Sequence, residues 1–78
     1  MTIGQNIKRL RRNADMTQEE LAEMLSISSQ AISRWETGTA IPDISFIPAI
    51  VNIFGTTSDE LLGINSNNFQ EKIEKYKK

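Results

Sequence analysis

Side chains suited to recognition are concentrated between residues 29 and 37. Gln30 and Arg34 are four positions apart, so on a helix they share one face, with Ser29 and Ser33 beside them. An arginine can donate two hydrogen bonds to guanine, a glutamine can pair twice with adenine, and a serine hydroxyl discriminates less. These four residues are therefore candidates for reading base edges in the major groove of double-stranded DNA. A plain solvated surface remains the alternative for all of them.

A second group of polar and basic residues has the chemistry to contact phosphate. Gln18 falls in the first turn of a predicted helix, where free backbone N–H groups attract an anion. Lys8 and Arg12 belong to a basic cluster and point away from the apolar side of the first predicted helix; the alternative for both is a solvated face. Thr17 and Thr37 complete the group, but Thr17 is more typical of a helix cap and Thr37 is as typical of a polar helix end.

The composition argues against catalysis and metal binding. The 78 residues include no Cys and no His, which removes thiolates, the usual general base and the commonest neutral metal ligand. We therefore expect no enzyme, no metal and no cofactor. No apolar run approaches the roughly 20 residues of a membrane span, so we expect a cytoplasmic protein with no membrane partner. The net charge is −1, so any contact with DNA must come from a local patch.

Helical periodicity runs through the first 63 residues, and no strand pattern interrupts it. Ile3, Ile7, Leu10 and Ala14 repeat at the spacing of one helix face, and this first helix is expected to end near Asn13. Four further helices are predicted. The second turns Leu21, Ala22 and Leu25 inward, and the third turns Ala31, Ile32 and Trp35 inward. The apolar residues of the last two are Phe46, Ile47, Ile50, Val51 and Phe54, and then Leu61 and Leu62. Five helices with short links predict an all-α fold, a compact five-helix bundle.

The predicted helix ends carry capping residues. Thr17 to Glu20 and Thr57 to Glu60 have the Thr-x-x-Glu spacing of a capping box, and Ser28 is suited to cap the helix that follows it. If Ser45 caps the fourth helix, Pro48 falls at its third position, where the missing N–H breaks no bond. Glycines suited to a left-handed helix end are expected at three positions: Gly38, Gly55 and Gly63.

The chain divides into a domain over residues 1–64 and a tail over residues 65–78. Residues 65–68 are polar and read as a linker. Beyond them Phe69, Ile73 and Tyr76 have the spacing of one helix face. The tail is either a frayed basic extension or an extra C-terminal helix packed on the bundle. A dimer contact and the start of a further domain are additional alternatives.

The central residues together resemble a known family. The quoted positions are Thr17-Gln18-Glu19-Glu20-Leu21-Ala22, Ile27-Ser28, Ile32-Ser33-Arg34-Trp35-Glu36-Thr37-Gly38 and Pro42-Asp43. At this spacing they are similar to the phage-repressor/Cro-like helix-turn-helix family, also called the Xre family, over residues 3–63. In one departure, Ser26 stands where the turn usually carries glycine. In another, Thr39, Ala40 and Ile41 are uncharged where several relatives are basic.

The resemblance implies a lambda-repressor-like bundle that binds double-stranded DNA sequence-specifically and regulates transcription, most often as a repressor. Residues 28–37 would be the helix that reads the major groove, and Gln18 would contact the DNA backbone. A palindromic operator and a homodimer are implied as well. The dimer surface is expected among apolar residues near the C-terminal end of the bundle: Ile53, Leu62 and Ile64, together with Phe69, Ile73 and Tyr76.

In relatives, the residue at the Arg11 position pairs with the acid at the Glu36 position. We therefore expect Arg11 and Glu36 to form a partly buried structural ion pair that braces the first helix against the reading helix. A second function class stays open, namely a protein-interaction module of the antitoxin or anti-repressor type built on the same bundle. The acidic residues in the middle of the sequence favour that alternative.

Overall fold

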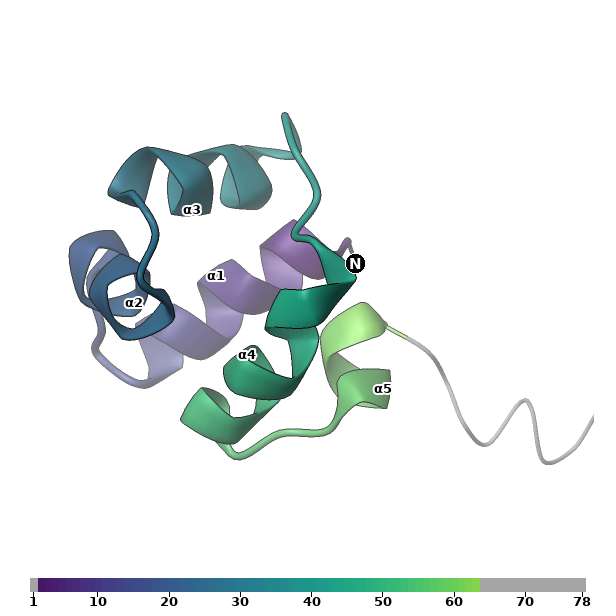
Figure 1. The fold of residues 1–78 in the computed structure, drawn as a ribbon. Helices are drawn as coiled ribbons and strands as arrows, with labels where there is room; N and C mark the ends of the chain where they lie inside the picture. Colours follow the sequence, from purple (N-terminus) through teal and green to yellow (C-terminus); the bar gives the residue numbers. More distant parts are fainter. Residues whose placement is uncertain (1, 64–78) are drawn as a thin grey trace, which may run out of the picture.

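The computed structural model describes residues 2–63, and the predictions made for residues 65–78 lie outside this range. All the described elements are helical, as predicted. They are α1 (Ile3–Asn13), α2 (Gln18–Leu25), α3 (Ser29–Thr37), a short 3-10 helix η1 (Ile44–Phe46), α4 (Ile47–Phe54) and α5 (Ser58–Leu62). Figure 1 shows α3 on one side of α1, with α4 and α5 on the other side.

The core takes one fully buried side chain from each of the five α-helices. These residues are Ile7, Leu21, Ile32, Ile50 and Leu61, all with no exposed surface. Full burial of such a side chain stabilises a fold by about 1.5–3 kcal/mol. Trp35 is also buried, and its ring lies 5.5 Å from that of Phe46 in a tilted arrangement. The bundle therefore depends on all five helices at once.

Most predicted helix ends are confirmed. The Thr17 hydroxyl accepts from the Glu20 N–H while the Glu20 carboxylate accepts from the Thr17 N–H, which completes the capping box before α2. Ser28 caps α3 through the Ala31 N–H, and Gly38 ends it at φ +84°. One cap was missed: Thr2 and Gln5 form a capping box before α1, although glutamine is as good as glutamate at that position.

Three predictions about local structure are wrong. Ala14 is exposed, because α1 ends at Asn13 before its next inward turn. Ser45 does not cap α4: the Asp43 carboxylate accepts its N–H, η1 forms first, and Pro48 falls in the first turn of an α4 without a side-chain cap. Thr57 does cap α5, but the Glu60 carboxylate accepts from the Thr56 hydroxyl, so the second capping box is incomplete.

Two residues of α1 fix its neighbours and were not singled out from the sequence. A Cβ on Gly4 would lie 1.8 Å from the Trp35 carbonyl oxygen, so only glycine lets α1 pass this close to the end of α3. Asn6 is buried, and its Nδ2 donates to the Leu61 carbonyl at 2.9 Å and to the Glu60 carbonyl at 3.3 Å. These bonds reach carbonyls in the last turn of α5, where intrahelical donors run out; the Glu60 carbonyl also accepts from the Gly63 N–H.

Candidate nucleic-acid interface

The turn between α2 and α3 sets the direction in which α3 leaves. Ser26 adopts the left-handed conformation at φ +58°, which costs more for serine than for the glycine expected there. The Ile27 N–H then donates to the Ala22 carbonyl, and Ser28 begins the cap of α3. With Ile32 and Trp35 buried beneath it, α3 is held on its inner side and presents its outer side to solvent.

The four predicted base-reading residues lie on that outer side of α3. Gln30 and Arg34 are exposed, whereas Ser29 and Ser33 are half-buried. Within residues 2–63, no hydrogen bond or ion pair engages any of these four side chains. Their donors and acceptors are therefore available to a partner molecule. The two long side chains project farthest, which makes Gln30 and Arg34 the best placed to contact a base edge.

The predicted ion pair between Arg11 and Glu36 is present and bidentate. Arg11 Nε lies 2.8 Å from Glu36 Oε2, and Arg11 Nη2 lies 2.9 Å from Oε1. The third guanidinium nitrogen, Nη1, donates to the Met16 carbonyl at 2.8 Å. The side chains are only 11% and 2% exposed, so the pair is shielded from water. It joins the end of α1, the turn after it and the end of α3.

Gln18 shares the same carboxylate. Its Nε2 donates to Glu36 Oε1 at 3.1 Å, so the start of α2 is tied to the end of α3. Burial raises the Glu36 pKa, but the hydrogen bonds from Arg11 and Gln18 and the charges of Arg11 and Lys8 bring it below the usual value. The hydrogen bond to Glu36 raises the pKa of Arg11. Glu36 therefore stays ionised and fixes the Gln18 amide.

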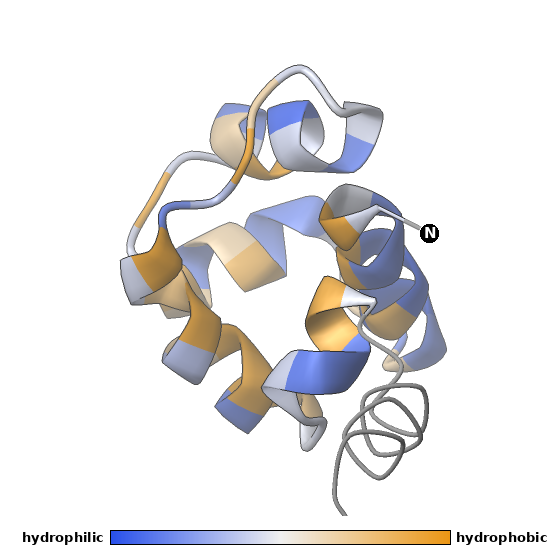
Figure 2. Cartoon of the chain, turned by 90° about the vertical axis from the view of Figure 1, so that its right-hand side faces the viewer, coloured by the Kyte–Doolittle hydropathy of each residue, from blue (hydrophilic) through white to orange (hydrophobic). Residues whose placement is uncertain are grey.

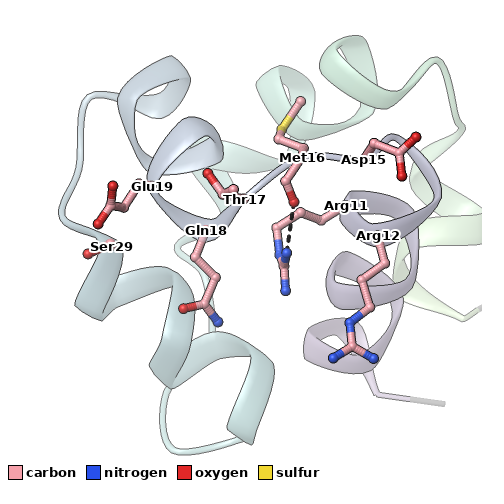
Figure 3. A pocket seen from close by; sticks show the side chains of 8 residues that line it. All are labelled: Arg11, Arg12, Asp15, Met16, Thr17, Gln18, Glu19 and Ser29. Atoms are coloured by element: carbon pink, nitrogen blue, oxygen red, sulfur yellow. Dashed lines mark hydrogen bonds between the residues drawn. The ribbon is translucent and has the colours of Figure 1, made fainter.

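Three of the five predicted phosphate contacts, namely Arg12, Thr17 and Gln18, line one open hollow between α1, α2 and α3, and Thr37 does not. Figure 3 shows Arg12 from α1 and Gln18 from α2 extending along its two sides. One Gln18 Nε2 hydrogen is used by Glu36, and the second is free to donate. Arg12 is exposed, as is Lys8, which lines a neighbouring hollow on α1 together with Arg9 and Arg12.

The two threonines differ in what they can still donate. The Thr17 hydroxyl accepts the cap bond from Glu20, so its own proton stays available. The Thr37 hydroxyl donates back to the Ser33 carbonyl at 3.0 Å and lies 3.1 Å from the Thr39 hydroxyl. Donation to a phosphate by Thr37 would require this internal hydrogen bond to break, so Thr37 is a weaker candidate for a phosphate contact than Thr17.

The hollow also contains residues that the sequence analysis did not assign to it. Glu19 lies beside Ser29 and places a carboxylate next to the start of α3. The sequence signal that could have placed Glu19 here is its position directly after Gln18. No sequence signal could have predicted that the Met16 carbonyl accepts from Arg11, since any residue supplies a carbonyl. Among residues 2–63, no cluster of metal-ligating side chains occurs, and no helix is long and apolar enough to span a membrane.

Comparison with known families agrees with this geometry. A family described as helix-turn-helix matches residues 7–61, which is more than two thirds of the chain. The chain belongs to the helix-turn-helix family. Its α2, turn and α3 are the helix-turn-helix of this domain, and the predicted resemblance is thereby confirmed.

The curated relatives of this helix-turn-helix domain have several different names. It is 40% identical over 62 residues to the HTH-type transcriptional activator BcrR of Enterococcus faecalis, over 80% of this chain and 30% of the relative. It is 38% identical over 61 residues to the antitoxin PezA of Streptococcus pneumoniae, over 78% of this chain and 39% of PezA. The regulator ImmR of Bacillus subtilis is 33% identical, over 81% of this chain and 50% of ImmR. The chain thus spans about a third to a half of these relatives.

A solved structure shares the fold. The P22 c2 repressor, in a crystal structure with a synthetic operator, superposes with a TM-score of 0.73 at 27% identity. The match covers 80% of this chain and 94% of the repressor chain. The five-helix bundle predicted from the sequence is therefore confirmed as the phage-repressor fold, in a family of DNA-binding transcriptional regulators.

Proposed function

We propose that this helix-turn-helix domain binds double-stranded DNA sequence-specifically and places α3 in the major groove. The observation that carries the proposal is the outer side of α3. There Gln30 and Arg34 are exposed and have no side-chain partner within residues 2–63, while Ile32 and Trp35 hold the inner side. A major groove about 12 Å wide admits one α-helix. The likeness to a repressor crystallised with its operator supports the same docking.

Each side chain has a role that its contacts allow. Arg34 donates to guanine and Gln30 pairs with adenine, while Ser29 and Ser33 contact bases that approach closely. Gln18 donates its second amide hydrogen to a phosphate at the start of α2, where the helix dipole favours the anion. The further phosphate contacts are Arg12, Lys8 and Thr17, with Thr37 contributing only if its internal hydrogen bond opens.

The proposal extends to how the whole protein acts. Two copies bind as a homodimer to a palindromic operator, with half-sites one turn of DNA apart, about 34 Å. The regulator acts in the cytoplasm as a repressor, by occupying promoter DNA. Of the apolar residues expected at the dimer surface, Leu62 is exposed, Ile53 is half-buried against the core, and Ile64, Phe69, Ile73 and Tyr76 lie outside the described residues.

Selection of bound sequences from random DNA tests this proposal, followed by titration of the selected site across a salt series. Arg34→Ala should weaken binding to the selected site by about 1–3 kcal/mol and relax the preference at one base pair. Arg12→Ala removes the same charge from the phosphate-facing side. It should weaken selected and random DNA alike and reduce the salt slope by about one.

Two outcomes would contradict the proposal. One is a folded protein that enriches no sequence from the random pool. The other is an Arg34→Ala variant that keeps the wild-type base preference. A third measurement, footprinting on the selected site, tests the dimer separately. Protection of one half-site alone would contradict the homodimer but not the proposed DNA binding.

A protein-binding role is the second candidate function. The 38% identity to a protein named as an antitoxin favours it, as does the exposed acidic side of α2, which carries Glu19 and Glu23. Carboxylates on that side repel phosphate and suit a basic protein partner. A chain that melts cooperatively but selects no DNA would move this candidate ahead of the first.

A further inference from the structure

An apolar groove of about 410 Å³ lies where the connection between α3 and α4 meets α5. The residues lining it include Ile41 and Ile44 on the connection side, Ser58 and Leu62 on α5, and Ile3 and Ile47. Figure 2 faces this side of the molecule and shows hydrophobic positions on the connection, away from the centre of the bundle. The groove is distinct from the outer side of α3 and uses none of its residues.

Three of the four large hydrophobic side chains that are exposed within residues 2–63 line this groove. Ile44 is 83% exposed, Ile41 is 79% exposed and Leu62 is 43% exposed. Met24 is the one other large hydrophobic residue exposed to this degree within residues 2–63. Three such side chains around one hollow mark a surface that is covered in use, since scattered single residues need no explanation but a contiguous set does.

The charges beside the groove indicate what covers it. On the side of the α3–α4 connection, Asp43 stands in the sequence between two residues that line the groove, Pro42 and Ile44. On the α5 side, Asp59 follows the lining residue Ser58. Both aspartates are exposed. A second copy docked about a two-fold axis would bring the same acidic hollow against itself. Like charges would then face each other, and two concave surfaces would leave space between them. A convex, basic, amphipathic segment fits better.

The chain's own tail has this chemistry. On a helix, Phe69, Ile73 and Tyr76 fall within about 60° of one another, because each residue turns by about 100°. Lys72 and Lys77 fall on either side of that apolar stripe. Glu71 and Glu74 fall on the far side of the same helical wheel.

We infer that residues 69–77 bind in the groove of the same chain, with the apolar stripe against Ile41, Ile44 and Leu62 and with Lys72 and Lys77 beside Asp43 and Asp59. Phe69 follows Leu62 by seven residues, which span at most about 24 Å. Since Leu62 itself lines the groove, the tail begins beside the surface to which it would bind. Attachment through so short a linker gives the tail an effective concentration in the millimolar range, which a separate molecule rarely reaches.

Disulfide trapping in the full chain tests the inference. Because the sequence contains no cysteine, only the introduced pair can form a disulfide. Ser58→Cys supplies a groove cysteine, paired in separate variants with Lys72→Cys and with Lys77→Cys, because the direction of the tail is open. The control pairs Glu60→Cys, which is exposed on α5 but does not line the groove, with Lys72→Cys, so that control and groove pairs are tethered at a similar distance from the tail. At least one groove pair should close within the monomer roughly tenfold faster than the control pair.

Ile73→Asp added to the fast pair should return its rate to that of the control, while the melting temperature of the bundle changes little. Equal rates for the groove and control pairs would overturn the inference. So would covalent dimers in place of the closed monomer, because they would assign the groove to a second copy. The measurement is made without DNA, so its outcome is independent of the proposed DNA binding. The inference removes Leu62, Phe69, Ile73 and Tyr76 from the expected dimer surface and leaves Ile53 and Ile64 there.

Discussion

Replacing Glu36 tests whether the buried ion pair holds the helix-turn-helix together. Glu36→Leu leaves the Arg11 guanidinium 11% exposed, with one remaining bond to the Met16 carbonyl, and removes the acceptor of Gln18. Loss of one partner of a buried pair costs about 3–5 kcal/mol, and the partial exposure of Arg11 places this case near 3. For a domain of this size, that lowers the melting temperature by roughly 12–24 °C.

The double variant Arg11→Met with Glu36→Leu separates the cost of an unpaired charge from the cost of lost packing. Apolar residues of similar volume can replace a buried pair with little net loss, so we expect the double variant within about 1 kcal/mol of the wild type. Thermal and urea unfolding of the wild type, Arg11→Met, Glu36→Leu and the double variant completes a double-mutant cycle. A single Glu36→Leu variant as stable as the wild type, or a double variant below both singles, would refute the reasoning.

The same pair gives the protein a defined response to acid. The Glu36 pKa is lower folded than unfolded, so the unfolded chain binds the proton more readily. The stabilisation is fully present above the unfolded pKa, about 4.3, and is lost as the pH falls through the lower folded value. In the double variant this part of the acid dependence should be absent from unfolding curves recorded between neutral pH and acid. An unchanged acid profile would show that other carboxylates dominate.

The remaining predictions concern the two sides of α3 and its contact with α1. Gly4→Ala should destabilise the domain by about 1–3 kcal/mol in urea unfolding, because its Cβ meets the Trp35 carbonyl; wild-type stability would mean that α1 shifts freely. Trp35→Ala should cost about 3–5 kcal/mol as a buried aromatic, and a near-native melting curve would contradict its place in the core. Gln30→Ala should alter the selected DNA sequence without moving the melting temperature, whereas a large shift in melting would make Gln30 structural.

The parts of the fold that follow local rules could be predicted from the sequence. Capping residues such as Thr17 and Ser28 act within a single turn, and apolar periodicity identifies the inward face of each helix. The ion pair of Arg11 with Glu36 was expected from the family resemblance alone, since nothing local links residues 25 positions apart.

What the sequence could not reveal depends on contacts between distant segments. The role of Gly4 follows from the path of α3, and that of Asn6 from carbonyls 54 and 55 residues away. The predicted start of α4 was wrong because Asp43, and not Ser45, acts as the capping residue in this part of the chain. Only the three-dimensional path of the backbone decides between the two. At the candidate interface, helical spacing predicted the outer side of α3, but it did not show that Gln18 is bonded to Glu36.

The close approach at Gly4 has a consequence for how such a protein changes its target. Main chain of α3 lies directly against main chain of α1 there, so this contact between the two helices is made by backbone atoms of Gly4 and Trp35. Substitutions at Gln30 or Arg34 leave those atoms untouched. With the proposed base reading by α3, exchange of a few outward side chains would therefore change the DNA sequence that is bound while the backbone contact between α1 and α3 stays the same.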